Sequence, residues 1–143
     1  MAEDITGDSS YITAINLIQK TLAEKATKLD LSRLSLRQLP PEIGKLTNLR
    51  ELNLVGNKLS GLPSEIVQLI NLRELNIGFI SLSNFPPEIV QLTNLQSLNL
   101  TGNLLQSLPP EIGPLSVFAV SINISFNSAV ICFIILMVQV YFG

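Results

Sequence analysis

One frame of apolar residues recurs every 23 positions in this chain of 143 residues. It reads Leu-x-x-Leu-x-Leu-x-x-Asn-x-Leu-x-x-Leu-Pro-x-Glu-Ile-x-x-Leu, and its four copies begin at Ala26, Leu49, Leu72 and Leu95. A fixed period of this length is typical of a solenoid, in which each repeat is one coil that buries its apolar edge against neighbouring coils. The sequence therefore predicts stacked coils over residues 26–48, 49–71, 72–94 and 95–117.

Two parts of the frame predict the shape of each coil. The Leu-x-Leu alternation places two side chains inside and the residue between them outside, which predicts a short parallel strand. The Leu-Pro-x-Glu-Ile step predicts a short helical turn, because proline is preset for the first helical position and glutamate favours the positive end of the helix dipole. Strands pack more closely than helices are wide, so we expect the stack to curve with the sheet on its inside.

The repeated frame resembles that of the leucine-rich repeat family. The Leu-Pro-x-Glu-Ile step, with Thr-Asn-Leu before the strands, is similar to the intracellular, Ras-group type of that family. The segment from Thr21 to Leu39 is also similar to the start of short bacterial and cyanobacterial arrays, some of them joined to Ras-like GTPase domains. The resemblance implies an α/β repeat fold, with parallel strands on a concave face and short helical turns on the convex face.

Residues 1–25 are predicted to be a flexible lead followed by an N-terminal capping helix that starts near Ser10. Asp8, Ser9 or Ser10 can supply the N-cap. An open solenoid exposes the apolar end of its first coil, so we expect the helix to cover that end. The face expected to do so consists of Tyr11, Ile15, Ile18 and Leu22, and its expected contacts are Leu29, Leu31 and Leu36. The alternative is an amphipathic helix that binds a partner.

Residues 118–143 differ from the repeats, because no charged residue follows Glu111 in the sequence. Ile122, Ile124 and Asn127 repeat the strand frame displaced by one residue, which predicts a degenerate fifth strand. We expect the apolar tail that follows, which includes residues 129–138, to cover the end of the solenoid. A membrane segment within residues 117–142 is the alternative, and the chain could also be a fragment of a longer protein.

The asparagine of the frame is expected to point inward and to bond backbone groups of adjacent coils. Asn57 and Asn103 fit this role, which makes them a structural asparagine ladder. The ladder is interrupted by Leu34 and Ile80, which we interpret as local variation. On this basis Ile80→Asn is expected to restore a missing bond and to be neutral or slightly stabilising.

Composition excludes several classes of function. A net charge of -2 and a pI near 5.0 provide no basic surface, so nucleic acid is not expected as a partner. The absence of histidine and the single cysteine exclude His-based catalysis, Cys and His metal sites and intrachain disulfides, and no cofactor is expected. The acidic start does not resemble a secretory signal peptide, so a cytoplasmic location is expected. We therefore predict a non-enzymatic protein.

The outward positions of the strands form the candidate binding surface. They comprise a column of amide and carboxylate groups, a second column beside it, and two arginines at the border: Lys28, Asp30, Arg50, Glu51, Asn53, Arg73, Glu74, Asn76, Ser97, Asn99 and Thr101. Polar, directional contacts over an extended area suit a protein partner. The predicted function is an intracellular signalling scaffold or adaptor. The alternatives are the sensor region of a larger enzyme of the repeat-linked GTPase type, and a membrane-tethered recognition protein.

Overall fold

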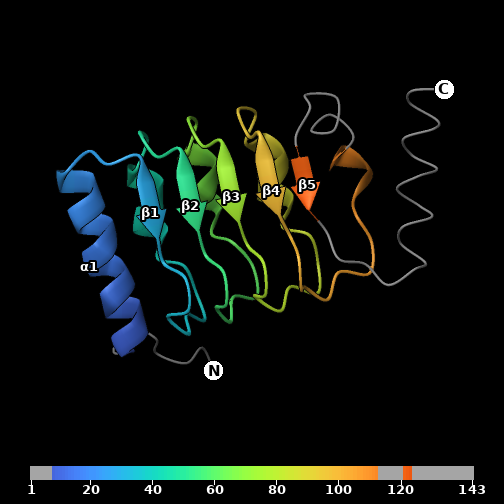
Figure 1. Ribbon diagram of the computed structural model, residues 1–143, viewed down its shortest axis with the longest axis horizontal. Helices are drawn as coiled ribbons and strands as arrows, with labels where there is room; N and C mark the ends of the chain where they lie inside the picture. The colour runs from blue at the N-terminus through green and yellow to red at the C-terminus, as the bar shows by residue number, and fades with distance from the viewer. Residues whose placement is uncertain (1–7, 113–120, 124–143) are drawn as a thin grey trace.

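The computed structural model describes residues 8–112 and 121–123. Five short strands form one parallel sheet in chain order: β1 (Lys28–Asp30), β2 (Glu51–Asn53), β3 (Glu74–Asn76), β4 (Ser97–Asn99) and β5 (Ser121–Asn123). Figure 1 shows the strands side by side, with helix α1 (Ser9–Ala23) beside β1 at one end. This arrangement confirms the predicted repeat solenoid and its N-terminal helix.

The register of the sheet follows the period of the sequence. Leu29, Leu52, Leu75 and Leu98 lie opposite one another at the centres of successive strands, so the structural repeat equals the sequence repeat. β5 pairs with β4 through Ile122 opposite Leu98, which places it one position later than the frame would. The predicted tail after residue 123 lies outside the described residues.

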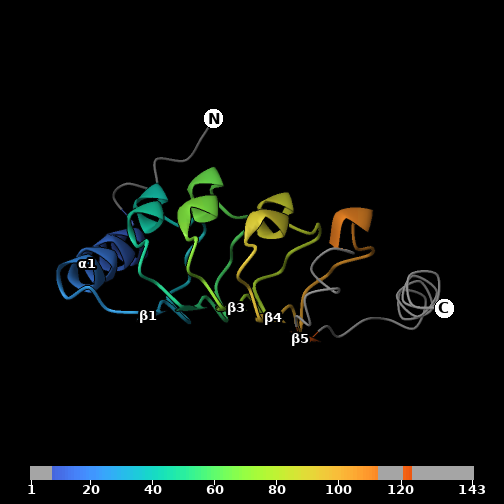
Figure 2. The same ribbon diagram turned by 90° about the horizontal axis from the view of Figure 1, so that it is seen from above.

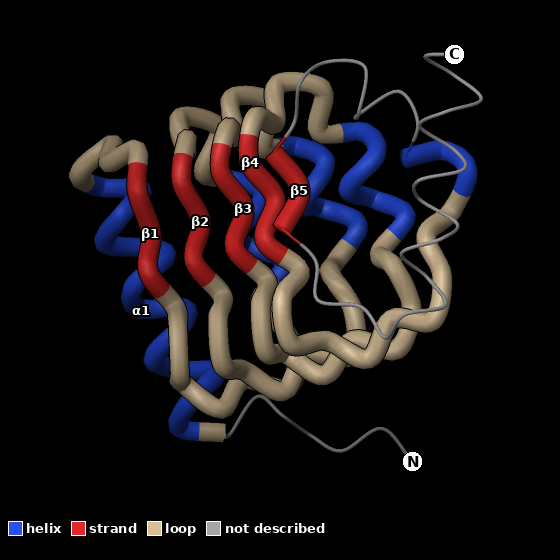
Figure 3. Tube along the Cα trace, turned by 45° about the vertical axis from the view of Figure 1, so that its right-hand side comes forward, coloured by secondary structure: helices blue, strands red, loops and turns tan. Residues whose placement is uncertain are grey.

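Each coil returns through a short 3-10 helix on the side opposite the sheet. These helices are η1 (Pro41–Lys45), η2 (Ser64–Gln68), η3 (Pro87–Gln91) and η4 (Pro110–Ile112). Figures 2 and 3 show them on one side of the coils and the strands on the other. The residue before each of the first three is a proline, which ends the preceding segment and starts the turn.

The core is a continuous stripe of leucine and isoleucine side chains that runs through the stack. Ile43, Leu54, Ile66 and Leu100 have no exposed surface, and they belong to one cluster that extends from α1 to Ile112. Burial of such a side chain adds about 1.5–3 kcal/mol to the free energy of unfolding, relative to leaving it exposed. Because each coil supplies only one slice of this stripe, stability depends on the contacts between neighbouring coils.

Helix α1 packs against β1 and η1, but its buried face is rotated from the predicted one. The Asp8 carboxylate caps the helix by accepting from the Ser10 amide at 2.9 Å. The buried residues are Ala14, Ile18 and Thr21, whereas Leu22 is 43% exposed. Tyr11 and Ile15, the other predicted members of the face, are only partly buried.

The small side chain of Ala14 and the hydrogen-bonded hydroxyl of Thr21 explain why the buried face of α1 is rotated. Ala14 allows the helix to approach the first coil closely, and the Thr21 hydroxyl donates to the Leu17 carbonyl at 2.8 Å, so Thr21 can be buried. Tyr11 lies near Glu42 of η1, and the burial of Tyr11 and the charge of Glu42 raise the pKa of the Tyr11 hydroxyl.

No helix among the described residues is long and apolar enough to cross a membrane.

The inward asparagines bond backbone groups of two coils. The Asn57 carbonyl oxygen accepts from the amides of Leu34 at 3.1 Å and Leu36 at 3.0 Å, and its amide nitrogen donates to the carbonyls of Leu31 and Leu54, both at 2.8 Å. Asn103 makes the equivalent four bonds, from 2.7 to 3.2 Å, to the third and fourth coils. These side chains take the place of water inside the turns.

Candidate protein-binding surface

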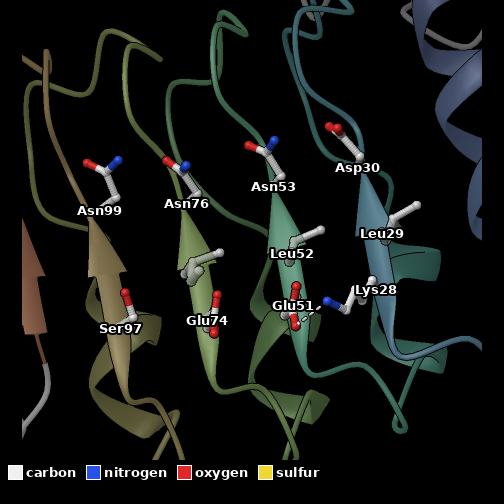
Figure 4. A pocket seen from close by; sticks show the side chains of 11 residues that line it. Lys28, Leu29, Asp30, Glu51, Leu52, Asn53, Glu74, Asn76, Ser97 and Asn99 are labelled. Carbon is white, nitrogen blue, oxygen red and sulfur yellow. Dashed lines mark ion pairs between the residues drawn. The ribbon is translucent and has the colours of Figure 1, made fainter.

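The outward residues of β1 to β4 line a groove on the sheet, which we call the concave groove. Its volume is about 560 Å³, and it is lined by Lys28, Leu29, Asp30, Glu51, Leu52, Asn53, Glu74, Leu75, Asn76, Ser97 and Asn99. The strand geometry explains the two polar columns, because the first and third residues of each strand point outward and the central leucine points inward. Figure 4 shows the columns in parallel.

The first column runs across the strands as Lys28, Glu51, Glu74 and Ser97. The Lys28 ammonium contacts the Glu51 carboxylate at 2.8 Å, and this bond and the charge of Glu51 raise the pKa of Lys28. The carboxylates of Glu51 and Glu74 lie opposite each other on neighbouring strands, an arrangement of like charges that disfavours folding. Glu74 forms no ion pair with any residue in the described ranges.

The second column consists of Asp30, Asn53, Asn76 and Asn99. Each side-chain oxygen accepts from the amide two residues later, at 2.8 Å from Ser32, 3.1 Å from Val55, 3.2 Å from Gly78 and 2.9 Å from Thr101. This local turn fixes the end of each strand. The Ser32 hydroxyl and amide hold the pKa of Asp30 below its usual value, and a hydrogen bond from Asn53 contributes in the same direction.

Eight of the predicted surface residues line the concave groove, and three lie outside it. Arg50 and Arg73 precede β2 and β3 and are exposed, but neither lines the groove. Thr101 follows β4, in the turn closed by Asn99, and does not line the groove either. The central leucines of β1 to β3 contribute to the floor of the groove, which the sequence interpretation did not include.

A second set of structural asparagines was missed by the sequence interpretation. The side-chain amide of Asn71 donates to the Thr47 carbonyl at 2.8 Å, and that of Asn94 donates to the Ile70 carbonyl at 2.6 Å. Each bond reaches the preceding coil just before a strand begins. The recurrence of Asn-Leu before the strands was visible in the sequence, and it could have predicted this role.

The side chains that line the concave groove are mainly polar. The groove offers three carboxylates, three side-chain amides, one ammonium group and one hydroxyl. The glutamates of the turns, Glu42, Glu65 and Glu88, belong to three separate 3-10 helices on the opposite side. No group of acidic or cysteine side chains that could hold a metal ion is found within the described ranges.

Comparison with known proteins agrees with the fold. The Leucine Rich Repeat family pattern matches residues 48–69 and 94–115. A leucine-rich repeat protein soc-2 homolog of Nematostella vectensis is 51% identical over 43 residues, which are 30% of this chain and 8% of that protein. The chain therefore spans less than a tenth of the length of this curated relative.

Two solved structures extend the comparison over most of the described residues. A leucine-rich repeat protein of Leptospira interrogans is 39% identical with a TM-score of 0.65, and the match covers 75% of this chain and 26% of that one. A plant peptide hormone receptor, solved in complex with RGF2, is 34% identical with a TM-score of 0.57, covering 75% of this chain and 18% of the receptor. With the period, the register and these matches together, the chain belongs to the leucine-rich repeat family.

Proposed function

We propose that this chain is a non-enzymatic protein-binding module that holds its partner in the concave groove. The observation that carries the proposal is the groove itself, a continuous polar surface across four strands. Glu74 supports it further, because this carboxylate has no ion pair within the described residues and faces another carboxylate on β2. A partner that brings donors or a cation to this place would relieve the repulsion.

The relatives support a protein partner in general terms. Leucine-rich repeat proteins generally mediate protein–protein interactions, and the plant peptide hormone receptor was solved in complex with RGF2. The Leu-Pro-x-Glu-Ile step supports the Ras-group type of repeat, and with it an intracellular scaffold or adaptor role in signalling. These finer assignments, including a cytoplasmic location, form part of the proposal.

The proposal can be tested by moving one positive charge within the groove. The double variant Lys28→Glu/Glu74→Lys keeps the net charge and transfers the cation from one side of Glu51 to the other. The matched control is Glu24→Lys/Lys45→Glu, which exchanges two exposed charges outside the groove. Both variants are first checked for an unchanged unfolding midpoint.

Affinity capture from cell extract, with quantitative mass spectrometry, provides the measurement. We expect the wild-type chain and the control to enrich the same protein, and the groove variant to lose it. Purified partner then has to bind the wild-type chain directly, with weaker binding to the groove variant. Equal binding by all three chains would place the interaction elsewhere and contradict the proposal.

A further inference from the structure

The four coils are not equivalent, because their turns after the strand alternate between two forms. In the first and third coils two residues other than glycine have positive φ, namely Arg33 at 55° and Ser35 at 59°, and Phe79 at 53° and Ser81 at 65°. In the described parts of the second and fourth coils the only positive φ belongs to a glycine, Gly56 at 72° and Gly102 at 70°. The turn geometry thus repeats every two coils.

The inward asparagines follow the same alternation. They occur in the second and fourth coils, and each bonds two amides and one carbonyl of the coil before it. The third coil has Ile80 at this position, fully buried, and its apolar side chain cannot form the equivalent bonds to the second coil. Asn57 therefore joins the first coil to the second, and Asn103 joins the third to the fourth.

One backbone hydrogen bond is also confined to these two junctions. The Lys58 amide donates to the Leu36 carbonyl at 2.7 Å, and the Leu104 amide donates to the Leu82 carbonyl at 2.8 Å. The equivalent bond between the second and third coils would join Ser81 to Leu59, and it is not formed in the described part of the chain. Ser81 differs from its counterparts in backbone conformation as well, because it has a positive φ whereas Lys58 and Leu104 do not.

One turn position alternates between a large residue and glycine for a steric reason. It is occupied in successive coils by Arg33, Gly56, Phe79 and Gly102. A β-carbon on Gly56 would lie 3.0 Å from the Arg33 side chain, and one on Gly102 would collide with the Phe79 ring. The large residue of one coil thus lies over the glycine of the next, so a second large residue there would have to displace it. On the opposite side, Gly44 lets η1 approach η2 closely, because a β-carbon there would meet Glu65 and Gln68 of η2.

We propose that the solenoid is assembled from coil pairs, the first with the second and the third with the fourth, and that the junction between the pairs is its hinge. Asn57 with the Lys58–Leu36 bond closes one pair, and Asn103 with the Leu104–Leu82 bond closes the other. The hinge lies between β2 and β3, so it runs through the middle of the concave groove.

Amide hydrogen exchange measured by NMR tests the hinge, because the same backbone bond occurs at all three junctions. The amides of Leu31, Leu54 and Ile77 donate to the carbonyls of Asn53, Asn76 and Asn99 at 2.9, 2.8 and 3.0 Å. A stack of identical coils would open from its ends, so Leu54 would be the best protected of the three. We expect the reverse, with Leu54 exchanging at least tenfold faster than Leu31 and Ile77. Slowest exchange at Leu54 would overturn the hinge.

Insertion of extra coils tests the pairing independently. A second copy of residues 49–94 placed after residue 94 keeps the alternation, whereas a second copy of residues 72–94 at the same point places two Phe79-type coils in succession. We expect the longer insertion to raise the unfolding midpoint by several degrees, since added coils bury more surface. The shorter insertion should lower the midpoint or abolish cooperative unfolding. The contrary result is a shorter insertion that raises the unfolding midpoint by about half as much as the longer one. That result would show that single coils are the unit of assembly, and it would overturn the pairing.

Discussion

Asn57 lies inside the turn of the second coil with 3% of its surface exposed, whereas Asn76 lies partly exposed at the end of β3 in the concave groove. Asn57 makes four hydrogen bonds that connect two coils. The oxygen of Asn76 accepts one bond, from Gly78 in its own turn. The same residue type thus stabilises the stack in one place and shapes a surface in the other. Burial and the number of hydrogen bonds distinguish the two roles.

The largest expected effect comes from Asn57→Leu, which removes the inner bonds. Two amides and two carbonyls would remain in an apolar environment, so we expect a loss of about 3 kcal/mol in the free energy of unfolding. Urea unfolding followed by circular dichroism measures it. Asn76→Ala, which loses only a local bond, should cost less than about 1 kcal/mol. Equal losses would remove the distinction between the inner and outer asparagines.

Ile80→Asn should destabilise the chain by about 2 kcal/mol, because it replaces a fully buried apolar side chain in a turn of a different form. This reverses the sequence-based expectation, which assumed that all four coils turn alike. The same unfolding measurement applies, with Ile80→Val as a control that keeps the apolar character. Stabilisation by Ile80→Asn would mean that the third coil can adopt the turn of the second.

The repeat period was sufficient to predict the strands, the short helical turns and the inward direction of Asn57, since these follow from local patterns repeated in one register. The alternation of turns was not predictable in this way. It depends on how Arg33 and Phe79 contact glycines of the next coil, and on backbone angles that these residue types rarely adopt. The helix face was misplaced because Ala14 and Thr21 are weak signals in an apolar pattern, although both are buried.

The polar residues that line the concave groove were predictable from the sequence, but their hydrogen bonds and ion pair were not. Strand alternation placed Glu51, Asn53, Glu74 and Asn76 on one surface, as the structure shows. The sequence could not show that the amide oxygens of Asn53 and Asn76 already accept from their own backbone, which leaves them less available to a partner. Nor could it show that Lys28 pairs with Glu51 and not with Glu74.

A smaller effect is expected at Gly102, in the turn that carries the chain from the outer Asn99 to the inner Asn103. Gly102→Ala should cost about 1–2 kcal/mol, because alanine is disfavoured at a φ of 70° and its β-carbon would displace the Phe79 ring. Gly61→Ala is the matched control, with open space around its β-carbon and no expected loss. Part of the loss should be recovered in a Phe79→Ala background. No recovery would show that backbone strain alone is responsible.

The smallest effect is expected at Asp30, the one carboxylate in the second column of the concave groove. Its pKa is lower in the folded chain than its usual value of 3.8, so its contribution to stability is present above that value and is lost as pH falls through the folded pKa. The side chain is exposed, so solvent screening limits this contribution to about 0.5 kcal/mol or less. Asp30→Asn should keep the bond to the Ser32 amide, as asparagine does in the next three strands, and leave stability at pH 7 nearly unchanged. Unfolding midpoints should therefore fall slightly less in Asp30→Asn than in the wild-type chain when they are measured from pH 5 down to pH 2.5. A steeper fall in Asp30→Asn than in the wild-type chain would mean that the carboxylate does not stabilise the folded state.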